Sequence, residues 1–503
     1  MKKKIAVCLA AAITFGAVST FSASARMVKA GDADLNGKVN IVDATCIQMN
    51  IAGLSEFSDA QKMVSDVDNN GSVEITDVTL VQKISAEQIE NNVELDVPED
   101  PTEPATSEPV YTEDEIEQKG SKAMNDFSVK LLRGSVQDGR NTLVSPLSVL
   151  YALGMSENGA NGNTLKEIEN TTGMPRSLMK AYLMNYPDYK QYQEDSSTKF
   201  HIANSVWYNT SQNSAKVSDN YISSVRDNYD AEVFPTIFNQ LALENINGWV
   251  NEKTDRMIPS ILTDIDSNVL MYLINAISFE AVWDEPYVNE YISGKHRYSG
   301  DVSEGRFTNS DGNTSIVDFM SSDEYIYLKD DNAQGFVKQY EYGNYAFAAI
   351  LPDKDVKLND YVNSLTGDRL SNILNNMSRD SVTVVAELPK FQVEYSDDLS
   401  DNLKALGIKD AFGLKADFKG MLADKNAISP FISQVLHKTT ISVTERGTKA
   451  AAVTAMVMYG ATAVEERHYV YLDRPFLYMI INMKTNTPIF IGTIENLPDK
   501  IAE

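Results

Sequence analysis

Residues 443–454, near the C-terminus, read VTERGTKAAAVT and have the pattern of a segment that can adopt two conformations. Gly447 has no Cβ atom, so the chain can pivot there without steric strain. Beyond this pivot every second residue is uncharged, as in a strand that lays one face against a core. These positions are Thr448, Ala450, Ala452, Thr454, Met456 and Met458. The segment therefore predicts a loop that later becomes a strand or, because alanine is the best helix former, a helix.

Nine further segments form a series between about residues 116 and 498. They are NTLVSPLSVLYAL at 141–153, GANGNT at 159–164, ANSVW at 203–207, INGWVNEKT at 246–254, LINAISFEAVW at 273–283, LPKF at 388–391, LHK at 436–438, DRPF at 473–476 and TPIFIG at 487–492. In this order the series resembles the serpins, a family of serine protease inhibitors. The resemblance implies a monomeric α+β domain over residues 115–500. Its fold would be a large central mixed or antiparallel β-sheet with surrounding helices and an exposed reactive loop.

The resemblance also implies a mechanism, the suicide inhibition of a target serine protease. The protease attacks the loop and forms a covalent acyl-enzyme. The freed loop then inserts into the central sheet before water releases the enzyme, so the native state must be a kinetic trap. In such a fold the insertion starts at the hinge, the segment at the start of the reactive loop. The two regions where the strands of the sheet separate to admit the loop are called the breach and the shutter. The hinge residues are Glu445, Gly447, Thr448, Ala450, Ala451 and Ala452, and the shutter and breach residues are Ser145, Ser148, Asn275, Trp283 and His437.

The position of the reactive bond follows from the usual spacing in the family. Counting about sixteen residues from Glu445 gives the bond between Ala461 and Thr462. Two alternatives stay open, Val464-Glu465 and Tyr459-Gly460. Ala or Val before the bond would suit elastase-like or subtilisin-like proteases, and Tyr a chymotrypsin-like one.

The N-terminus has the pattern of a secretory signal peptide over residues 1–25. Three lysines at 2–4 precede an apolar stretch, and ASA at 23–25 is a small-residue cleavage site. The stretch is too short to span a bilayer comfortably, so no membrane insertion is expected. Cleavage leaves Cys46 as the one cysteine, which excludes an internal disulfide. With 71 acidic against 44 basic residues, the net charge of −27 argues against nucleic acid as a partner.

An internal repeat occupies residues 32–43 and 66–77, which read DADLNGKVNIVD and DVDNNGSVEITD. Oxygen-bearing side chains at loop positions one, three, five and twelve, with Gly at six, are typical of a calcium loop. Position twelve is Asp rather than the usual Glu. We expect two Ca²⁺ ions, one in each loop. Their ligands would be Asp32, Asp34, Asn36, Lys38, Asn40 and Asp43 in the first loop, and Asp66, Asp68, Asn70, Ser72, Glu74 and Asp77 in the second.

A helical stretch follows each loop, with Thr and Gln at matching positions. The duplication resembles a dockerin, a small all-α module over residues 28–90 that docks onto cohesin domains of cellulosome scaffolds. The resemblance implies a cohesin-binding face made of Ile41, Val42, Gln48, Met49, Ile75, Thr76, Gln82 and Lys83. The two copies differ on this face, which argues against a symmetric two-way binding mode.

Residues 91–114 are rich in Pro, Glu and Thr and cannot bury a core, so we expect a linker there. Together the segments indicate a secreted protein that works outside a bacterium, on a cellulosome or the cell surface.

Two other classes of function stay open from the sequence, an enzyme and a non-inhibitory binding module of serpin fold. Dockerins often accompany polysaccharide-degrading enzymes, and Ser145 with His437 could be interpreted as a nucleophile and its base. However, no His-Glu-x-x-His helix or Gly-x-Ser-x-Gly elbow is present. The resemblance assigns both residues to the shutter, so we expect no catalytic residues.

Overall fold

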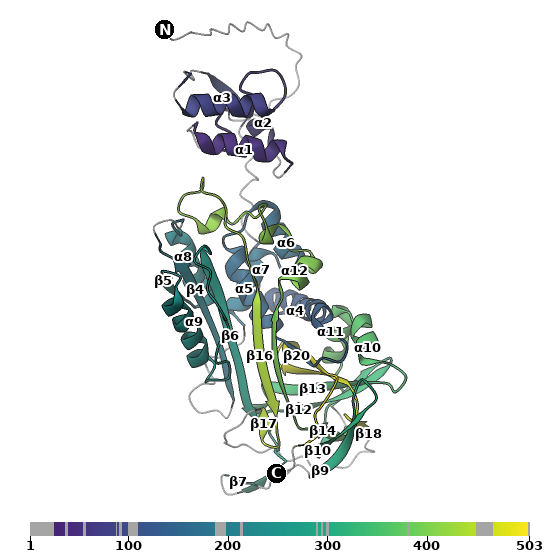
Figure 1. The fold of residues 1–503 in the computed structure, drawn as a ribbon. Helices are drawn as coiled ribbons and strands as arrows, with labels where there is room; N and C mark the ends of the chain where they lie inside the picture. The colour runs from purple at the N-terminus through teal and green to yellow at the C-terminus, as the bar shows by residue number, and fades with distance from the viewer. Residues whose placement is uncertain are drawn as a thin grey trace. The chain divides into compact units, whose positions relative to one another are not determined.

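The computed structural model describes residues 25–35, 39–53, 57–86, 88–89, 93–98, 109–186, 198–211, 215–287, 290–292, 295–297, 301–379, 382–448 and 466–500. The chain divides into two compact units, residues Met1–Thr106 and Ser107–Glu503 (Figure 1). Each unit has its own buried apolar clusters and is described by itself.

The first unit is built from three helices and a two-stranded sheet. Its elements are β1 (Ala25–Lys29), α1 (Ile41–Ile51), α2 (Asp59–Ser65), α3 (Ile75–Ser85) and β2 (Glu94–Pro98). Helix α1 begins at Asn40, whose side chain accepts a hydrogen bond from the Val42 amide at 2.8 Å. Ala44 and Ile47 of α1 pack with Val78 and Val81 of α3 in one core. Strand β2 lies within the range expected to be linker and pairs with β1.

The second unit mixes helices with three main sheets. Its helices are α4 (Glu113–Ser135), α5 (Pro146–Glu157), α6 (Gly162–Thr172), α7 (Arg176–Met184), α8 (Asp219–Tyr229), α9 (Gln240–Lys253), α10 (Leu358–Ser364), α11 (Gly367–Asn375) and α12 (Ser400–Leu406). Short 3₁₀ turns lie at Glu341–Gly343, Asp410–Phe412 and Lys419–Met421. The strands up to the middle of the unit are β3 (Thr142–Val144), β4 (Lys199–Asn209), β5 (Ala231–Thr236), β6 (Met271–Val282), β7 (Glu290–Ile292), β8 (Lys295–Arg297), β9 (Val302–Thr308), β10 (Thr314–Glu324), β11 (Tyr327–Asp330) and β12 (Ala333–Gln339). The later ones are β13 (Tyr345–Pro352), β14 (Val382–Pro389), β15 (Phe391–Asp398), β16 (Leu436–Val443), β17 (Gly447–Thr448), β18 (Glu466–Tyr471), β19 (Phe476–Asn482) and β20 (Thr487–Ile494).

The central sheet has the strand order β15-β16-β17-β6-β4-β5. A second sheet runs β11-β12-β13-β19-β20-β3, and a third runs β18-β14-β10-β9. Strands β13, β19 and β20 are buried along their whole length, which places the core between the sheets. Helix α9 covers the part of the sheet formed by β4 and β6, and α5 packs on β6 and β20 (Figure 1).

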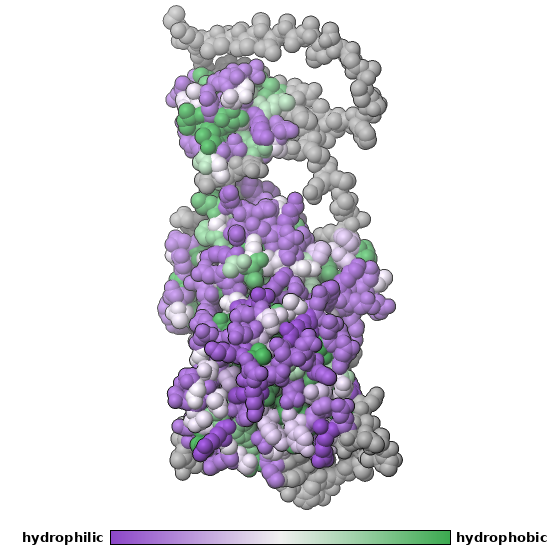
Figure 2. Space-filling view, turned by 90° about the vertical axis from the view of Figure 1, so that its right-hand side faces the viewer, coloured by the Kyte–Doolittle hydropathy of each residue, from purple (hydrophilic) through white to green (hydrophobic). Residues whose placement is uncertain are grey.

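Helix α4 shows how the local sequence sets an element. Thr112 accepts a hydrogen bond from the Glu115 amide, and the Glu115 carboxylate accepts one from the Thr112 amide, which forms a capping box. From there Met124, Phe127 and Leu131 recur at helical spacing and are fully buried. Hydrophilic residues cover most of the face of this unit seen in Figure 2, in keeping with the acidic composition.

Candidate functional site

The start of the stretch 443–454 lies inside the central sheet. Its two residues Gly447 and Thr448 form β17, which is antiparallel to β6 with Gly447 opposite Val282 and to β16 with Thr448 opposite Val443. A Cβ atom on Gly447 would collide with the backbone carbonyl of Ala281, so only glycine fits this close approach. Among the described residues β16 and β6 are joined through β17 and form no ladder with each other.

Thr448 points into the core beneath the sheet, where it is 1% exposed. Its Oγ1 is 2.5 Å from the hydroxyl oxygen of Tyr340. The Tyr340 ring stacks on Trp283, with ring centroids 4.6 Å apart and planes 7° apart. The indole Nε1 of Trp283 donates to the Thr444 carbonyl at 2.9 Å. The breach residue Trp283 therefore contacts Thr444 directly and Thr448 through Tyr340.

Glu445 anchors the outer side of the hinge through an ion pair. Its Oε1 is 2.7 Å from Nζ of Lys390, and the same ammonium lies 2.9 Å from Oδ2 of Asp318. Partial burial alone would raise the pKa of Glu445, but the hydrogen bond from Lys390 lowers it overall. Glu445 therefore keeps its negative charge well into the acid range.

The shutter is a hydrogen-bond cluster at the other end of β16. The amide of Ser145 donates to Nε2 of His437 at 3.0 Å, and the Ser145 hydroxyl donates to the Ile489 carbonyl at 2.8 Å. The amide of Ser148 in turn donates to Oγ of Ser145 at 3.2 Å. Complete burial lowers the pKa of His437 to about 4, so its imidazole is neutral at pH 7 and accepts a hydrogen bond. Nε2 of His437 accepts from the Ser145 amide and the hydroxyl donates to Ile489, so His437 is not placed as a base for Ser145, and the geometry fits a structural role.

Asn275 of β6 lies across the gap from His437 and has different partners. Its Nδ2 donates to Oδ1 of Asn204 at 2.7 Å, and Asn204 donates to the Tyr229 carbonyl at 2.7 Å. A cavity of about 330 Å³ lies between the start of β6, up to Asn275, and the first two residues of β16, Leu436 and His437. Ser148 of α5 also lines it. Because β6 and β16 are both antiparallel to β17, the cavity and β17 occupy opposite ends of one gap.

Several predicted site residues lie outside the described residues. These are Ala450, Ala451 and Ala452 of the hinge, Ala461 and Thr462 of the reactive bond, both alternative bonds, and Asn36 and Lys38 of the first acidic loop. The expected signal peptide up to residue 24 also lies outside them.

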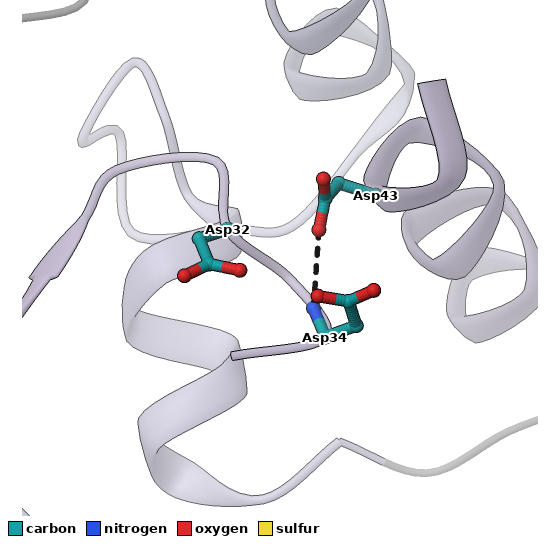
Figure 3. Close-up of side chains that lie close together, drawn as sticks. All are labelled: Asp32, Asp34 and Asp43. Atoms are coloured by element: carbon teal, nitrogen blue, oxygen red, sulfur yellow. Dashed lines mark hydrogen bonds between the residues drawn. The ribbon is translucent and has the colours of Figure 1, made fainter. Parts of the chain in front are cut away.

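The first acidic loop brings three carboxylates together. Oxygens of Asp32, Asp34 and Asp43 all lie within 4.8 Å of one another (Figure 3). Asp43 accepts hydrogen bonds from the amides of Asn40 at 2.8 Å and of Asp34 at 3.2 Å, which fixes its carboxylate over the loop. Burial raises the pKa of Asp43 to about 6, and the charges of Asp34 and Asp32 add to the rise. A divalent cation bound by oxygen ligands would relieve this repulsion, so the donor set fits Ca²⁺.

The second acidic loop repeats the arrangement. Oxygens of Asp66, Asp68 and Asp77 lie within 4.8 Å of one another. The amide of Gly71 donates to Oδ2 of Asp66 at 2.8 Å, and Gly71 has a φ of +89°, which its position at the sharp turn requires. Of the other predicted ligands, Asn70 accepts from the Ser72 amide at 2.9 Å, and Glu74 is the N-cap residue of α3.

The residues expected to contact a cohesin lie on α1 and α3. Ile41 and Ile75, the first residues of these helices, are 56% and 62% exposed. The remaining members are exposed or partly exposed, and they are Val42, Gln48, Met49, Thr76, Gln82 and Lys83. Two apolar side chains held this far into solvent are consistent with a binding surface.

Comparison with known proteins agrees with this geometry. A family model described as serpin (serine protease inhibitor) matches residues 122–497, which is most of the chain. The chain belongs to the serpin family. The expected fold is confirmed, and because serpins are protease inhibitors rather than enzymes, so is the expectation that the chain is not an enzyme.

Three relatives illustrate the similarity. The native-state crystal structure of the thermophilic serpin tengpin is 38% identical, covers 78% of this chain and 96% of its own, and has a TM-score of 0.66. Iripin-5 of Ixodes ricinus is 30% identical over 75% of this chain and 94% of its own length. Intracellular coagulation inhibitor 2 of Tachypleus tridentatus is 26% identical over 75% of this chain and 90% of its own length.

A second family model, the type I dockerin domain, matches residues 30–84. This serpin therefore carries an N-terminal dockerin, as its repeated loops predict. Type I dockerins bind calcium and cohesins and imply an extracellular cellulosome context. Within the described part of the chain, no helix combines the length and apolar character needed to cross a bilayer.

Sequence reasoning missed two residues that hold the hinge, Tyr340 and Lys390. Lys390 lies in the motif at 388–391, so its place in the series was a usable signal. Tyr340 is one of 24 tyrosines, and nothing in its local sequence distinguishes it from the others. Asn204, the partner of Asn275, lies in the motif at 203–207, where the sequence predicts a strand but no role in the shutter.

Proposed function

We propose that this serpin is a secreted suicide-substrate inhibitor of serine proteases, with elastase-like or subtilisin-like enzymes as targets. Its serpin domain, over residues 115–500, acts as a monomer. The N-terminal residues 1–25 direct secretion. The dockerin, over residues 28–90, holds two Ca²⁺ ions and binds a cohesin, and the linker at 91–114 separates the two modules.

The observation that carries the proposal is the seating of Gly447 and Thr448 between β6 and β16. An inhibitory loop must enter the sheet at this point once it is cleaved. Gly447 and Thr448 are already paired with β6, so the inserting strand does not have to form its first pairs from an unpaired loop. The entropy cost of bringing the start of the loop to the sheet has therefore been met before cleavage.

The register of β17 supports the same proposal further along the gap. If each following residue pairs one position earlier along both neighbours, Thr454 arrives opposite Asn275 on β6 and His437 on β16. These two residues line the cavity at the shutter end. The uncharged alternate positions after Thr448 would then face the core, where a charged side chain would be costly.

Incubation with pancreatic elastase and with subtilisin tests the inhibitory function. An inhibitor leaves a covalent adduct that survives boiling in SDS, because the acyl-enzyme is trapped. A chain that is clipped without an adduct would instead be a non-inhibitory binding module.

The position of the reactive bond is tested by Ala461→Arg. The residue before the bond fills the primary pocket of the protease, and an acidic pocket prefers a long cation. The second-order rate constant should therefore rise for trypsin and fall for elastase. If both constants stay unchanged while Val464→Arg or Tyr459→Arg switches them, the bond lies at that other position. An intact-mass measurement of the released C-terminal peptide locates it directly.

The docking function is tested by Asp32→Ala combined with Asp66→Ala. Each is the first ligand of its loop, so both calcium sites should fail to close. We expect loss of calcium-dependent cohesin binding and unchanged protease inhibition. Calorimetry with calcium alone should give two sites per wild-type chain, and loss of inhibition in the double variant would show that the two modules are not independent.

A further inference from the structure

A buried ion pair lies beneath the hinge, between strands of two different sheets. Lys338 of β12 is 2% exposed and Glu324 of β10 is 8% exposed, and Lys338 Nζ is 2.7 Å from Glu324 Oε1. Burial alone would lower the pKa of Lys338, but the carboxylate of Glu324 raises it overall, so the ammonium stays charged. A buried ion pair is seldom more stabilising than apolar residues of the same size. Its role here would then be to fix the positions of neighbouring side chains.

The carboxylate of this pair is held by a short chain of hydroxyl groups. Glu324 Oε1 accepts a hydrogen bond from Oγ of Ser322 at 2.6 Å, and Ser322 lies 3.0 Å from the hydroxyl of Tyr287. Tyr287 is 3% exposed, so the chain is sealed from water. The pair therefore has a defined position and is not free to adjust to its surroundings.

The ammonium of Lys338 also faces two aromatic rings. It lies 4.5 Å from the ring centroid of Tyr287 and 5.7 Å from that of Trp283. Both distances are within the range of cation–π attraction, which is stronger where the cation is shielded from water. Lys338 thus ties the two rings to the ion pair.

Tyr287 and Trp283, which carry these two rings, also form hydrogen bonds with the hinge segment. The amide of Tyr287 donates to the Glu445 carbonyl at 2.8 Å, and the amide of Trp283 donates to the Arg446 carbonyl at 2.9 Å. Trp283 adds its indole bond to Thr444 and its stack on Tyr340, which contacts Thr448. One intermediate residue, Trp283 or Tyr287, therefore links Lys338 to each of residues 444 to 446. Two intermediates, Trp283 and Tyr340, link it to Thr448.

We propose that the Lys338–Glu324 pair positions Trp283 and Tyr287 so that the hinge stays seated in the sheet, and that it thereby sets how fast the loop inserts. Lys338 and Glu324 are positioning residues, because they act on the hinge through Trp283 and Tyr287. When the pair is removed, the two rings lose their fixed support and Gly447 and Thr448 leave the gap more often. A cleaved loop must then re-enter before it can insert, so more inhibitor is consumed as substrate. This consequence for inhibition rests on the proposed function, whereas the seating of the hinge does not.

The test compares the full-length wild type with Lys338→Met combined with Glu324→Gln. The double change keeps the shape and leaves no unpaired buried charge, so the variant should fold. Lys338→Arg, which keeps the charge and the face toward the rings, is the conservative variant. A matched control is Arg369→Met with Asp330→Asn. This pair is also joined at 2.7 Å, and Arg369 also lies over a ring, that of Tyr361 at 5.2 Å.

Amide hydrogen exchange of a peptide covering residues 443–448 measures the seating directly. Because each cation–π contact is modest, exchange should be about two- to fivefold faster in Lys338→Met/Glu324→Gln. The exchange rate should stay near the wild-type rate in Lys338→Arg. It should also stay near the wild-type rate in Arg369→Met/Asp330→Asn, even where this control lowers the thermal midpoint as much as Lys338→Met/Glu324→Gln does. Unchanged exchange in the double variant, or an equal rise in the control, overturns the proposal.

The second measurement is the number of inhibitor molecules consumed for each protease trapped. This number should rise in Lys338→Met/Glu324→Gln and not in the control. If exchange rises while this number stays unchanged, the pair seats the hinge but does not set the rate of insertion, and that half of the proposal fails. If the wild type traps no protease at all, the proposed function fails while the exchange result still decides the seating.

Discussion

The two ends of the gap between β6 and β16 are built differently. At the breach end, two residues of the loop are already in place, held by the ion pair of Glu445 with Lys390 and by the stacked rings of Trp283 and Tyr340. At the shutter end a cavity of about 330 Å³ remains, bordered by neutral hydrogen bonds of Ser145 and His437. One end is already paired and the other is still open, so under the proposed function insertion would start at the breach end and proceed toward the shutter end.

The largest effect is expected from Thr448→Arg, which breaks the breach end. Thr448 is buried against Tyr340, and an unpaired guanidinium there costs several kcal/mol. Insertion slows and hydrolysis of the acyl-enzyme wins, so the variant should be cleaved as a substrate. Counting the inhibitor molecules consumed per trapped protease measures this. An unchanged count would mean that the register of β17 is not the one used in insertion.

A smaller effect is expected from Gly447→Ala at the same end. The added methyl group would collide with the Ala281 carbonyl, so the hinge must shift out of its place between β6 and β16. Trapping should become less efficient but remain detectable, because the positions after Thr448 are unaltered. Gly248, whose added methyl group would meet nothing within 4 Å, gives the control variant Gly248→Ala. If both variants trap protease as well as the wild type, close approach at Gly447 is not needed.

The shutter end should respond to pH where the breach end does not. The folded-state pKa of His437 is lowered to about 4, so the unfolded chain takes up its proton first as the pH falls. Stability is then lost between about pH 6.5 and pH 4, by up to about 3 kcal/mol. Partial burial raises the pKa of Glu445, but the hydrogen bond from Lys390 lowers it overall, so Glu445 takes up its proton at a lower pH than an ordinary glutamate.

Thermal midpoints measured at pH 7 and at pH 4.5, with the same scan rate, check this prediction. The midpoint should be lower at pH 4.5. His437→Gln keeps an acceptor for the Ser145 amide and removes the titrating group, so it should flatten the pH dependence. An equally steep loss in His437→Gln would place the titrating group elsewhere.

The smallest effect is expected from Lys390→Met. The side chains of Lys390 and Glu445 are 31% and 28% exposed, so water screens their attraction and the pair contributes about 1 kcal/mol or less. The thermal midpoint should fall slightly, and trapping should change far less than in Thr448→Arg. An effect on trapping as large as that of Thr448→Arg would show that the outer ion pair, rather than the buried contacts, holds the hinge.

Features whose chemistry is local can be predicted from the amino-acid sequence alone. The ligands of each acidic loop fall within twelve consecutive residues, so Asp32 and Asp43 are identified with no knowledge of the rest of the chain. The pivot at Gly447 and the uncharged positions after it are likewise readable from one short stretch, and the ordered motifs identified the family.

The residues that hold this stretch in place could not be predicted without the fold. Tyr340, Lys338 and Lys390 lie about 60 to 110 residues from the hinge in sequence, and no spacing rule connects them to it. The structure also separated Asn275 from the Ser145–His437 cluster, since Asn275 bonds Asn204 instead. Contacts of this kind depend on how sheets and helices pack, and packing is set by the whole core rather than by any local pattern.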